Sequence, residues 1–152
     1  MKTNNFSNIK IEAITGEQTL PIRHAVLRKG KPIEACPIPE DNLKTTYHFG
    51  LFYNNKLVAV STFVIDKSVY FKEPNQYRLR AMGVLEGYQG LQLGKQLLNF
   101  GVHFLKEKKV ERLWFNARII ALNFYKKNGF ETIGPVFNIP NVGDHFVMHK
   151  KL

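Results

Sequence analysis

Residues 84–98 read Val84-Leu85-Glu86-Gly87-Tyr88-Gln89-Gly90-Leu91-Gln92-Leu93-Gly94-Lys95-Gln96-Leu97-Leu98. An alternating, strand-like run ends at Val84, and leucines at helical spacing begin at Leu93. The first N–H groups of a helix lack partners inside the helix, and together with the helix dipole they attract anions. Gly90 and Gly94 have no Cβ, so a phosphate can approach the backbone closely. The stretch predicts a phosphate-binding turn, although a tight turn with close helix packing explains the same glycines.

Two familiar nucleotide-binding patterns do not fit this stretch. No Gly-Lys-Ser/Thr follows at the spacing of a Walker A loop. Gln92 stands where a dinucleotide fingerprint would have its third glycine, and no acidic residue ends the next strand-like run, Leu113 to Asn116.

The rest of the chain predicts strands on both sides of this turn and helices between them. Strand patterns cover residues 9–14, 47–53, 56–65, 76–84, 113–115, 130–136 and 146–151, and helical patterns cover residues 20–27, 93–109 and 119–128. Asn54-Asn55 predicts a hairpin turn, and Gly134-Pro135, Pro140 and Gly143 are expected in the loop between the last two strands. The order favours a mixed sheet with helices packed on it, including one right-handed parallel crossover.

Bulk properties fit one globular domain over residues 1–152. Residues 1–8 have no apolar core of a secretory leader, and the longest apolar-rich run, 57–65, is too short to span a membrane. Cys36 is the only cysteine, so no internal disulfide can form, and we expect a cytoplasmic protein with Cys36 inert. The formal net charge of +10 is compatible with anionic partners, but the lysines are scattered.

Residues 89–94 resemble the signature of the GNAT superfamily of acyltransferases, Gln/Arg-x-x-Gly-x-Gly/Ala. Gln89 and Gly94 fit this pattern, whereas Gln92 replaces its central glycine. A second run, residues 121–130, resembles the family's Ala-x-x-Phe-Tyr-x-x-x-Gly-Phe segment. The resemblance covers nearly the whole chain and is strongest from Arg78 to Phe130.

The resemblance implies an α/β fold of the α+β type, typical of a compact single-domain member. Its central sheet would have about seven strands, be mixed but mostly antiparallel, be flanked by helices, and splay between strands 4 and 5. It further implies acetyl-CoA as co-substrate, held by Met82, Gly83, Val84, Gln89, Gly90, Leu91, Gln92, Leu93, Gly94, Lys95, Asn116, Asn123 and Lys127.

The implied reaction is direct attack of a primary amine on the thioester, with Tyr125 as the general acid. No base stands on the fourth strand, so either water or one of Glu34, Asp41 and His48 takes the amine's proton. Arg78 and Arg80, two residues apart, suit an acidic acceptor, although a salt-bridged face explains them equally.

Several alternatives stay open at this point. The acceptor is a small molecule or a peptide, and a homodimer is compatible with the resemblance. We expect no metal, because the histidines lack ligand spacing, and no membrane partner. A non-catalytic sensor of acyl-CoA is the main alternative, and a basic nucleic-acid-binding domain is a weaker one because no basic recognition helix is present.

Overall fold

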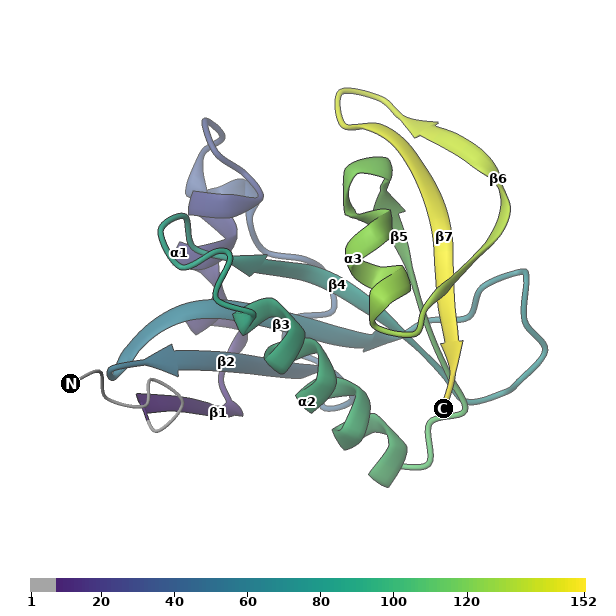
Figure 1. Cartoon of the computed structure of the whole chain (residues 1–152), viewed down its shortest axis with the longest axis horizontal. Helices are drawn as coiled ribbons and strands as arrows, with labels where there is room; N and C mark the ends of the chain where they lie inside the picture. The colour runs from purple at the N-terminus through teal and green to yellow at the C-terminus, as the bar shows by residue number, and fades with distance from the viewer. Residues whose placement is uncertain (1–7) are drawn as a thin grey trace. The chain divides into compact units, whose positions relative to one another are not determined.

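The computed structural model describes residues 8–152. The prediction about a secretory leader concerns the first residues of the chain, and residues 1–7 lie outside the described range. Seven strands hydrogen-bond in the order β1-β2-β3-β4-β5-β7-β6 (Figure 1). The strands are β1 (Ile9–Ala13), β2 (Tyr47–Tyr53), β3 (Lys56–Ile65), β4 (Gln76–Val84), β5 (Arg112–Arg118), β6 (Glu131–Ile139) and β7 (Gly143–Lys151). The strand β4 pairs with β5 in parallel, whereas the pairs β1–β2, β2–β3, β5–β7 and β6–β7 are antiparallel, which confirms the predicted mixed, mostly antiparallel sheet.

Three α-helices and two short 3-10 helices connect these strands. They are α1 (Gly16–Val26), η2 (Ile33–Ala35), α2 (Leu93–Glu107), η3 (Ile119–Ala121) and α3 (Leu122–Lys127). The helix α1 begins four residues before the predicted start, because Thr15 and Gln18 form a reciprocal capping box. None of the helices in the described range is both long and apolar enough to cross a membrane.

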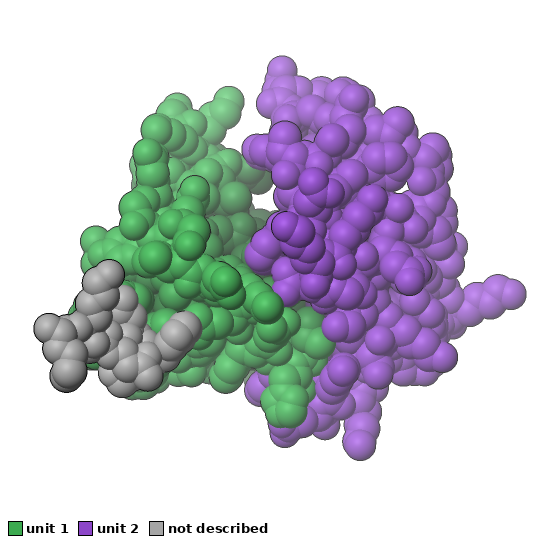
Figure 2. Space-filling model, viewed as in Figure 1, with its two compact units in different colours: residues 1–64, 80–103 green, residues 65–79, 104–152 purple. Residues whose placement is uncertain are grey.

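The chain divides into two compact units, coloured separately in Figure 2. Unit 1 comprises residues 1–64 and 80–103, and unit 2 comprises residues 65–79 and 104–152. The strand β4 contributes residues to both units, as does the helix α2. The assignment of residues 1–152 to one domain stays a prediction.

Unit 1 contains the predicted hairpin and the core around it. Asn54 and Asn55 have φ of +50° and +67°, the two left-handed residues that a type I′ turn needs. Val58, Ala59, Val60 and Phe63 of β3 are fully buried. On α2, a Cβ at Gly101 would overlap the Phe63 ring, so the helix lies against the strand at this glycine.

Unit 2 is organised around the antiparallel pairs β5–β7 and β6–β7. The expectation that Gly134-Pro135 lies in a loop was wrong. Both residues lie inside β6, at an irregularity between Ile133 and Phe137, where β7 pairing is interrupted. Proline lacks an N–H and is tolerated in a strand at such a position.

Candidate functional site

The segment from Val84 to Gln92 folds into an exposed loop that leads into α2. Leu85 N donates to Val58 O at 2.8 Å, which ties the start of the loop to β3. The side-chain amide of Gln89 donates to Val84 O at 3.0 Å and closes the loop on itself. The glutamine at the start of the predicted motif therefore shapes the loop.

Three residues of this loop have left-handed backbone. Gly87 and Gly90 have φ of +91° and +81°, and a Cβ at either glycine would meet no atom within 4 Å. Gln92 has φ of +61°, in the region that favours glycine. The position where the family pattern has its central glycine is thus one at which this chain carries a strained side chain.

The backbone amides at the start of α2 lack protein partners. Among residues 8–152 no hydrogen-bond acceptor is found for the amides of residues 90–95, whereas the next amide, Gln96 N, donates to Gln92 O at 3.2 Å. Six consecutive free donors at a helix start, reinforced by the dipole of a 15-residue helix, make a site for an anion. Lys95 is exposed beside them, and the side chain of Leu93 is buried in the core.

The end of β4, which carries the predicted cofactor-binding residues Met82, Gly83 and Val84, has an irregular backbone. The parallel register of β4 with β5 pairs Gln76–Arg78 with Arg112–Trp114, and β4 continues beyond it to Val84. Ala81 has φ of +55°, so the strand is distorted just before Met82 and Gly83. Gly83 is buried, and a Cβ there would lie 3.2 Å from Val26 Cγ1 of α1.

In unit 2, Tyr125 of α3 lies among aromatic rings. Its centroid is 4.4 Å from that of Phe115 and 6.1 Å from that of Phe130. Burial raises the pKa of Tyr125 to about 12. Within residues 8–152 no hydrogen-bond partner is found for its hydroxyl, which keeps its proton at neutral pH.

Three further predicted cofactor residues belong to unit 2. Asn116 is half-buried in β5 and pairs in register with Val147 of β7. Asn123 and Lys127 are exposed on α3.

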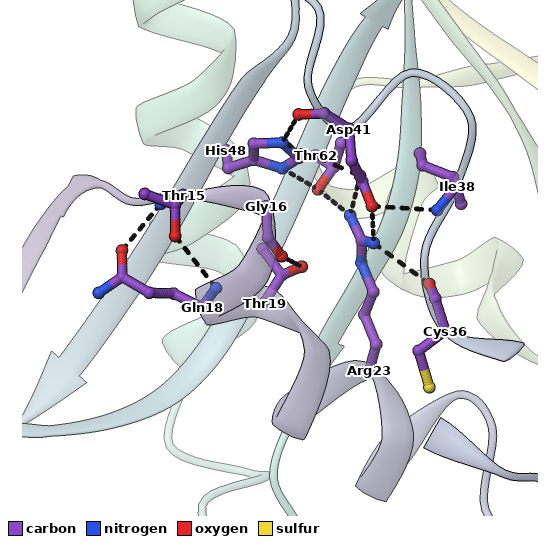
Figure 3. A network of polar contacts seen from close by, with 10 residues as sticks. All are labelled: Thr15, Gly16, Gln18, Thr19, Arg23, Cys36, Ile38, Asp41, His48 and Thr62. Carbon is purple, nitrogen blue, oxygen red and sulfur yellow. Dashed lines mark hydrogen bonds and ion pairs between the residues drawn. The ribbon is translucent and has the colours of Figure 1, made fainter. Parts of the chain in front are cut away.

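Two of the three base candidates belong to a buried polar network in unit 1 (Figure 3). Asp41 accepts two hydrogen bonds of 2.8 Å from the guanidinium of Arg23, which is 1% exposed. His48 contacts Thr62 Oγ1 through Nδ1 and Asp41 O through Nε2, both at 2.8 Å. Both ring nitrogens of His48 are engaged, which favours a structural role for this side chain.

The electrostatics of Asp41 point the same way. Burial by itself raises the pKa of this carboxyl, but hydrogen bonds from Arg23 and from Ile38 N and the nearby positive charge outweigh it and lower the pKa. A carboxylate whose charged form is stabilised in this way is a poor proton acceptor. Glu34, the third candidate, is exposed in η2.

The two predicted acceptor arginines are both engaged with acidic residues. Arg78 contacts Asp66 at 3.2 Å and lies over the Trp114 ring, 4.9 Å from its centroid. Arg80 lies 3.6 Å from Glu40. Each ion pair lies within one unit, Arg78 in unit 2 and Arg80 in unit 1.

Over the described range, no cluster of three histidine, cysteine, aspartate or glutamate side chains could hold a metal ion. Cys36 is buried and unpaired, and its carbonyl accepts a hydrogen bond from Arg23.

The model of the acetyltransferase (GNAT) family matches residues 19–130. The chain therefore belongs to this family, and the predicted enzyme class, an acetyl-CoA-dependent N-acetyltransferase, is confirmed.

Several relatives agree with this assignment. The chain is 36% identical over 144 residues to the uncharacterized N-acetyltransferase YitI of Bacillus subtilis (strain 168), covering 95% of this chain and 97% of the relative. The ribosomal-protein-S18-alanine N-acetyltransferase of Escherichia coli has the same fold, with a TM-score of 0.75, 18% identity, and coverage of 94% and 93%. A GNAT family acetyltransferase of Elizabethkingia anophelis, solved with acetyl-CoA bound, has a TM-score of 0.70, 17% identity, and coverage of 95% and 99%.

Sequence reasoning missed three residues of the polar clusters in unit 1. Arg23 interrupts the apolar helical face formed with Leu20 and Leu27, and a buried arginine on such a face requires an acidic partner. That signal indicates an acidic partner for Arg23 but does not say which residue it is. Thr62 and Glu40 gave no comparable signal, because their partners lie far away in the sequence.

Proposed function

We propose that this acetyltransferase binds acetyl-CoA through the unpaired amides of residues 90–95 and transfers its acetyl group to a primary amine of a small molecule or a peptide. The run of six free amide donors carries the proposal, because a diphosphate offers several strong acceptors and negative charge at once. The backbone of Met82, Gly83 and Val84 pairs with the pantetheine arm of the cofactor. Asn116 of β5 and Asn123 and Lys127 of α3 also contact acetyl-CoA in this proposal.

In this proposal the acceptor nitrogen attacks the thioester carbonyl carbon directly. The new C–N bond forms and the C–S bond breaks, so the sulfur departs with the bonding electron pair. Tyr125 donates its proton to that sulfur, and the proton of the amine passes to water. A hydroxyl whose pKa lies at about 12 stays protonated at neutral pH, as a general acid must.

A thiol-release assay tests this function. Purified protein with acetyl-CoA and a panel of primary amines should release free coenzyme A at a rate that depends on the amine. Secondary alcohols of the same size serve as controls and should give no release above hydrolysis. Tight acetyl-CoA binding without amine-dependent release would favour the non-catalytic sensor instead.

The proposal also includes the place of the protein in the cell. We place the protein in the cytoplasm, on the basis of its lone, buried cysteine.

A further inference from the structure

The turn that follows α1, residues 28–31, carries three basic side chains. Arg28, Lys29 and Lys31 are all exposed, and Gly30 lies between them. Gly30 has φ of +81°, and a Cβ there would meet no atom within 4 Å, so the space above the turn is open. We call residues 28–31 the basic turn.

The positive charges of the basic turn are not neutralised within the chain. Among residues 8–152 no ion pair is found for any of its three cations, and Arg28 Nη1 donates only to the carbonyl oxygen of its neighbour Leu27, at 3.3 Å. In contrast, the two arginines predicted to bind an acidic acceptor, Arg78 and Arg80, each have a carboxylate partner. The basic turn therefore keeps its charge for an anion from outside the chain.

Hydrogen bonds hold the basic turn at both ends. Lys31 N donates to Arg28 O at 2.9 Å, which closes the turn. The Nε2 atom of His24, on α1, lies 2.7 Å from Lys31 O and ties the far end of the turn back to the helix. Cations on a fixed backbone lose less conformational entropy on binding an anion than cations on a mobile loop.

The basic turn begins beside the proposed thioester site. A Cβ on Gly83 would lie 3.2 Å from Val26 Cγ1 and 3.6 Å from Leu27 Cγ, so the last residues of α1 pack on the end of β4. Gly83 is one of the residues proposed to pair with the pantetheine arm, and Arg28 follows Leu27 directly. All of these residues belong to unit 1. An amine that reaches the thioester can thus place a second group of the same molecule on the basic turn.

We propose that the basic turn binds an anionic group of the acceptor, so that the acceptor carries a carboxylate or a phosphate in addition to its primary amine. Arginine binds either group through paired N–H donors, and the two lysines attract both groups as point charges. Positive charge beside the site also raises the local concentration of such acceptors. This inference rests on the proposed acetyl transfer and narrows its substrate class.

The experiment measures amine-dependent thiol release from acetyl-CoA with two matched pairs of probe acceptors. The phosphate pair is O-phosphoethanolamine and ethanolamine, and the carboxylate pair is γ-aminobutyrate and butylamine. In at least one pair, the wild-type enzyme should have kcat/KM about fivefold or more higher for the anionic member. The pair that shows the preference identifies the anionic group. Added salt should reduce the preference, because the cations are exposed to solvent.

Substitutions in the basic turn should remove this preference. The triple variant Arg28→Gln, Lys29→Gln, Lys31→Gln should bring the ratio of the two kcat/KM values to about one. The single substitution Lys29→Glu should also lower the ratio, because it places a negative charge on the turn. The matched control removes three exposed lysine charges from unit 2 and should keep the wild-type ratio: Lys67→Gln, Lys72→Gln, Lys106→Gln. Calorimetric titration with acetyl-CoA shows whether each variant folds and binds its cofactor.

Each result decides the matter. Equal kcat/KM within both pairs for the wild-type enzyme would overturn the inference, as would a preference that survives in the triple variant. Loss of the preference in the control variant would assign it to net charge rather than to the basic turn, with the same consequence. Acetyl-CoA binding without release to any probe amine would also overturn the inference, whereas failure of the wild-type protein to bind acetyl-CoA would defeat the proposed function itself. If the triple variant does not fold, Lys29→Glu applies the same test.

Discussion

The guanidinium of Arg23 and the carboxylate of Asp41 meet in two parallel hydrogen bonds, each 2.8 Å long, inside unit 1. Arg23 comes from α1, and Asp41 from the segment between η2 and β2. Thr62 of β3 accepts a further bond from Arg23 at 2.9 Å, so the pair joins a helix, a connecting segment and a strand. This pair therefore supports the segment on which Glu40 lies.

Replacing Asp41 by Asn should lower the free energy of unfolding by about 3 kcal/mol, because Arg23 would be left as a buried charge without its partner. Urea titration followed by circular dichroism measures the change. Asp144→Asn, at an exposed position, is the matched control and should alter stability by less than about 0.5 kcal/mol. Equal effects of the two substitutions would contradict a stabilising role for the pair.

The same pair should make stability depend on acid pH. The pKa of Asp41 in the folded protein lies below its ordinary value of 3.8, so folding favours the ionised carboxylate. Its contribution is present above pH 3.8 and is lost as the pH falls below that value through the folded pKa. Stability measured as a function of pH should therefore fall less steeply in this range for Asp41→Asn than for wild type. Parallel curves for the two proteins would show that Asp41 does not contribute.

Gly101→Ala should destabilise unit 1, because the added methyl group would overlap the Phe63 ring. We expect a loss of about 1–3 kcal/mol despite the higher helix propensity of alanine. Thermal unfolding measures it, and the double variant Gly101→Ala with Phe63→Leu should recover part of the loss. A stabilised Gly101→Ala protein would show that α2 and β3 are not closely packed at this position.

Gln92→Gly should stabilise the protein by about 0.5–1 kcal/mol, because glycine adopts the left-handed backbone of residue 92 without strain. Gln96→Gly, in the first turns of α2, is the opposing control and should destabilise by about 1 kcal/mol. Chemical denaturation distinguishes the two, and destabilisation by both would contradict the strain assigned to Gln92.

Tyr125→Phe should lower kcat by about 100-fold and leave the KM for acetyl-CoA nearly unchanged, because only the transition state uses the hydroxyl. Its pKa of about 12 also means that wild-type kcat should not decline on account of this group between about pH 8 and pH 10. Rapid-quench or thiol-release kinetics measure both effects. A Tyr125→Phe enzyme with wild-type kcat would remove the tyrosine from the mechanism.

Local chemistry made much of this fold predictable from the sequence. The β2–β3 hairpin follows from strand runs on either side of Asn54-Asn55, and β4 and the start of α2 follow from a change in hydrophobic period at Leu93. The start of α1 was placed too late, because its capping box lies before the apolar pattern begins. The predicted strand over residues 130–136 ends before β6 does at Ile139, because the pairing that carries β6 past its irregularity comes from β7.

The candidate site was predictable to the extent that its residues adjoin in sequence. The loop and first turn of α2 were recognised from Gln89 and Gly94, and the structure adds the backbone strain at Gln92. The engagement of Asp41 by Arg23 and of Arg80 by Glu40 was not predictable, because the partners are 18 and 40 residues apart and meet only through the fold. Contacts of this kind depend on tertiary packing rather than on local pattern.

Calorimetric titration with acetyl-CoA tests the central claim, that the free amides opening α2 hold the diphosphate of the cofactor. Gly87 and Gly90 both have left-handed backbone and open space at Cβ, so Gly87→Asp and Gly90→Asp carry the same structural cost. The account predicts that Gly90→Asp weakens acetyl-CoA binding by about tenfold or more, through repulsion at the anion site, and that Gly87→Asp stays close to wild type. Equal affinities for the two variants, or no heat of binding with the wild-type protein, would contradict it.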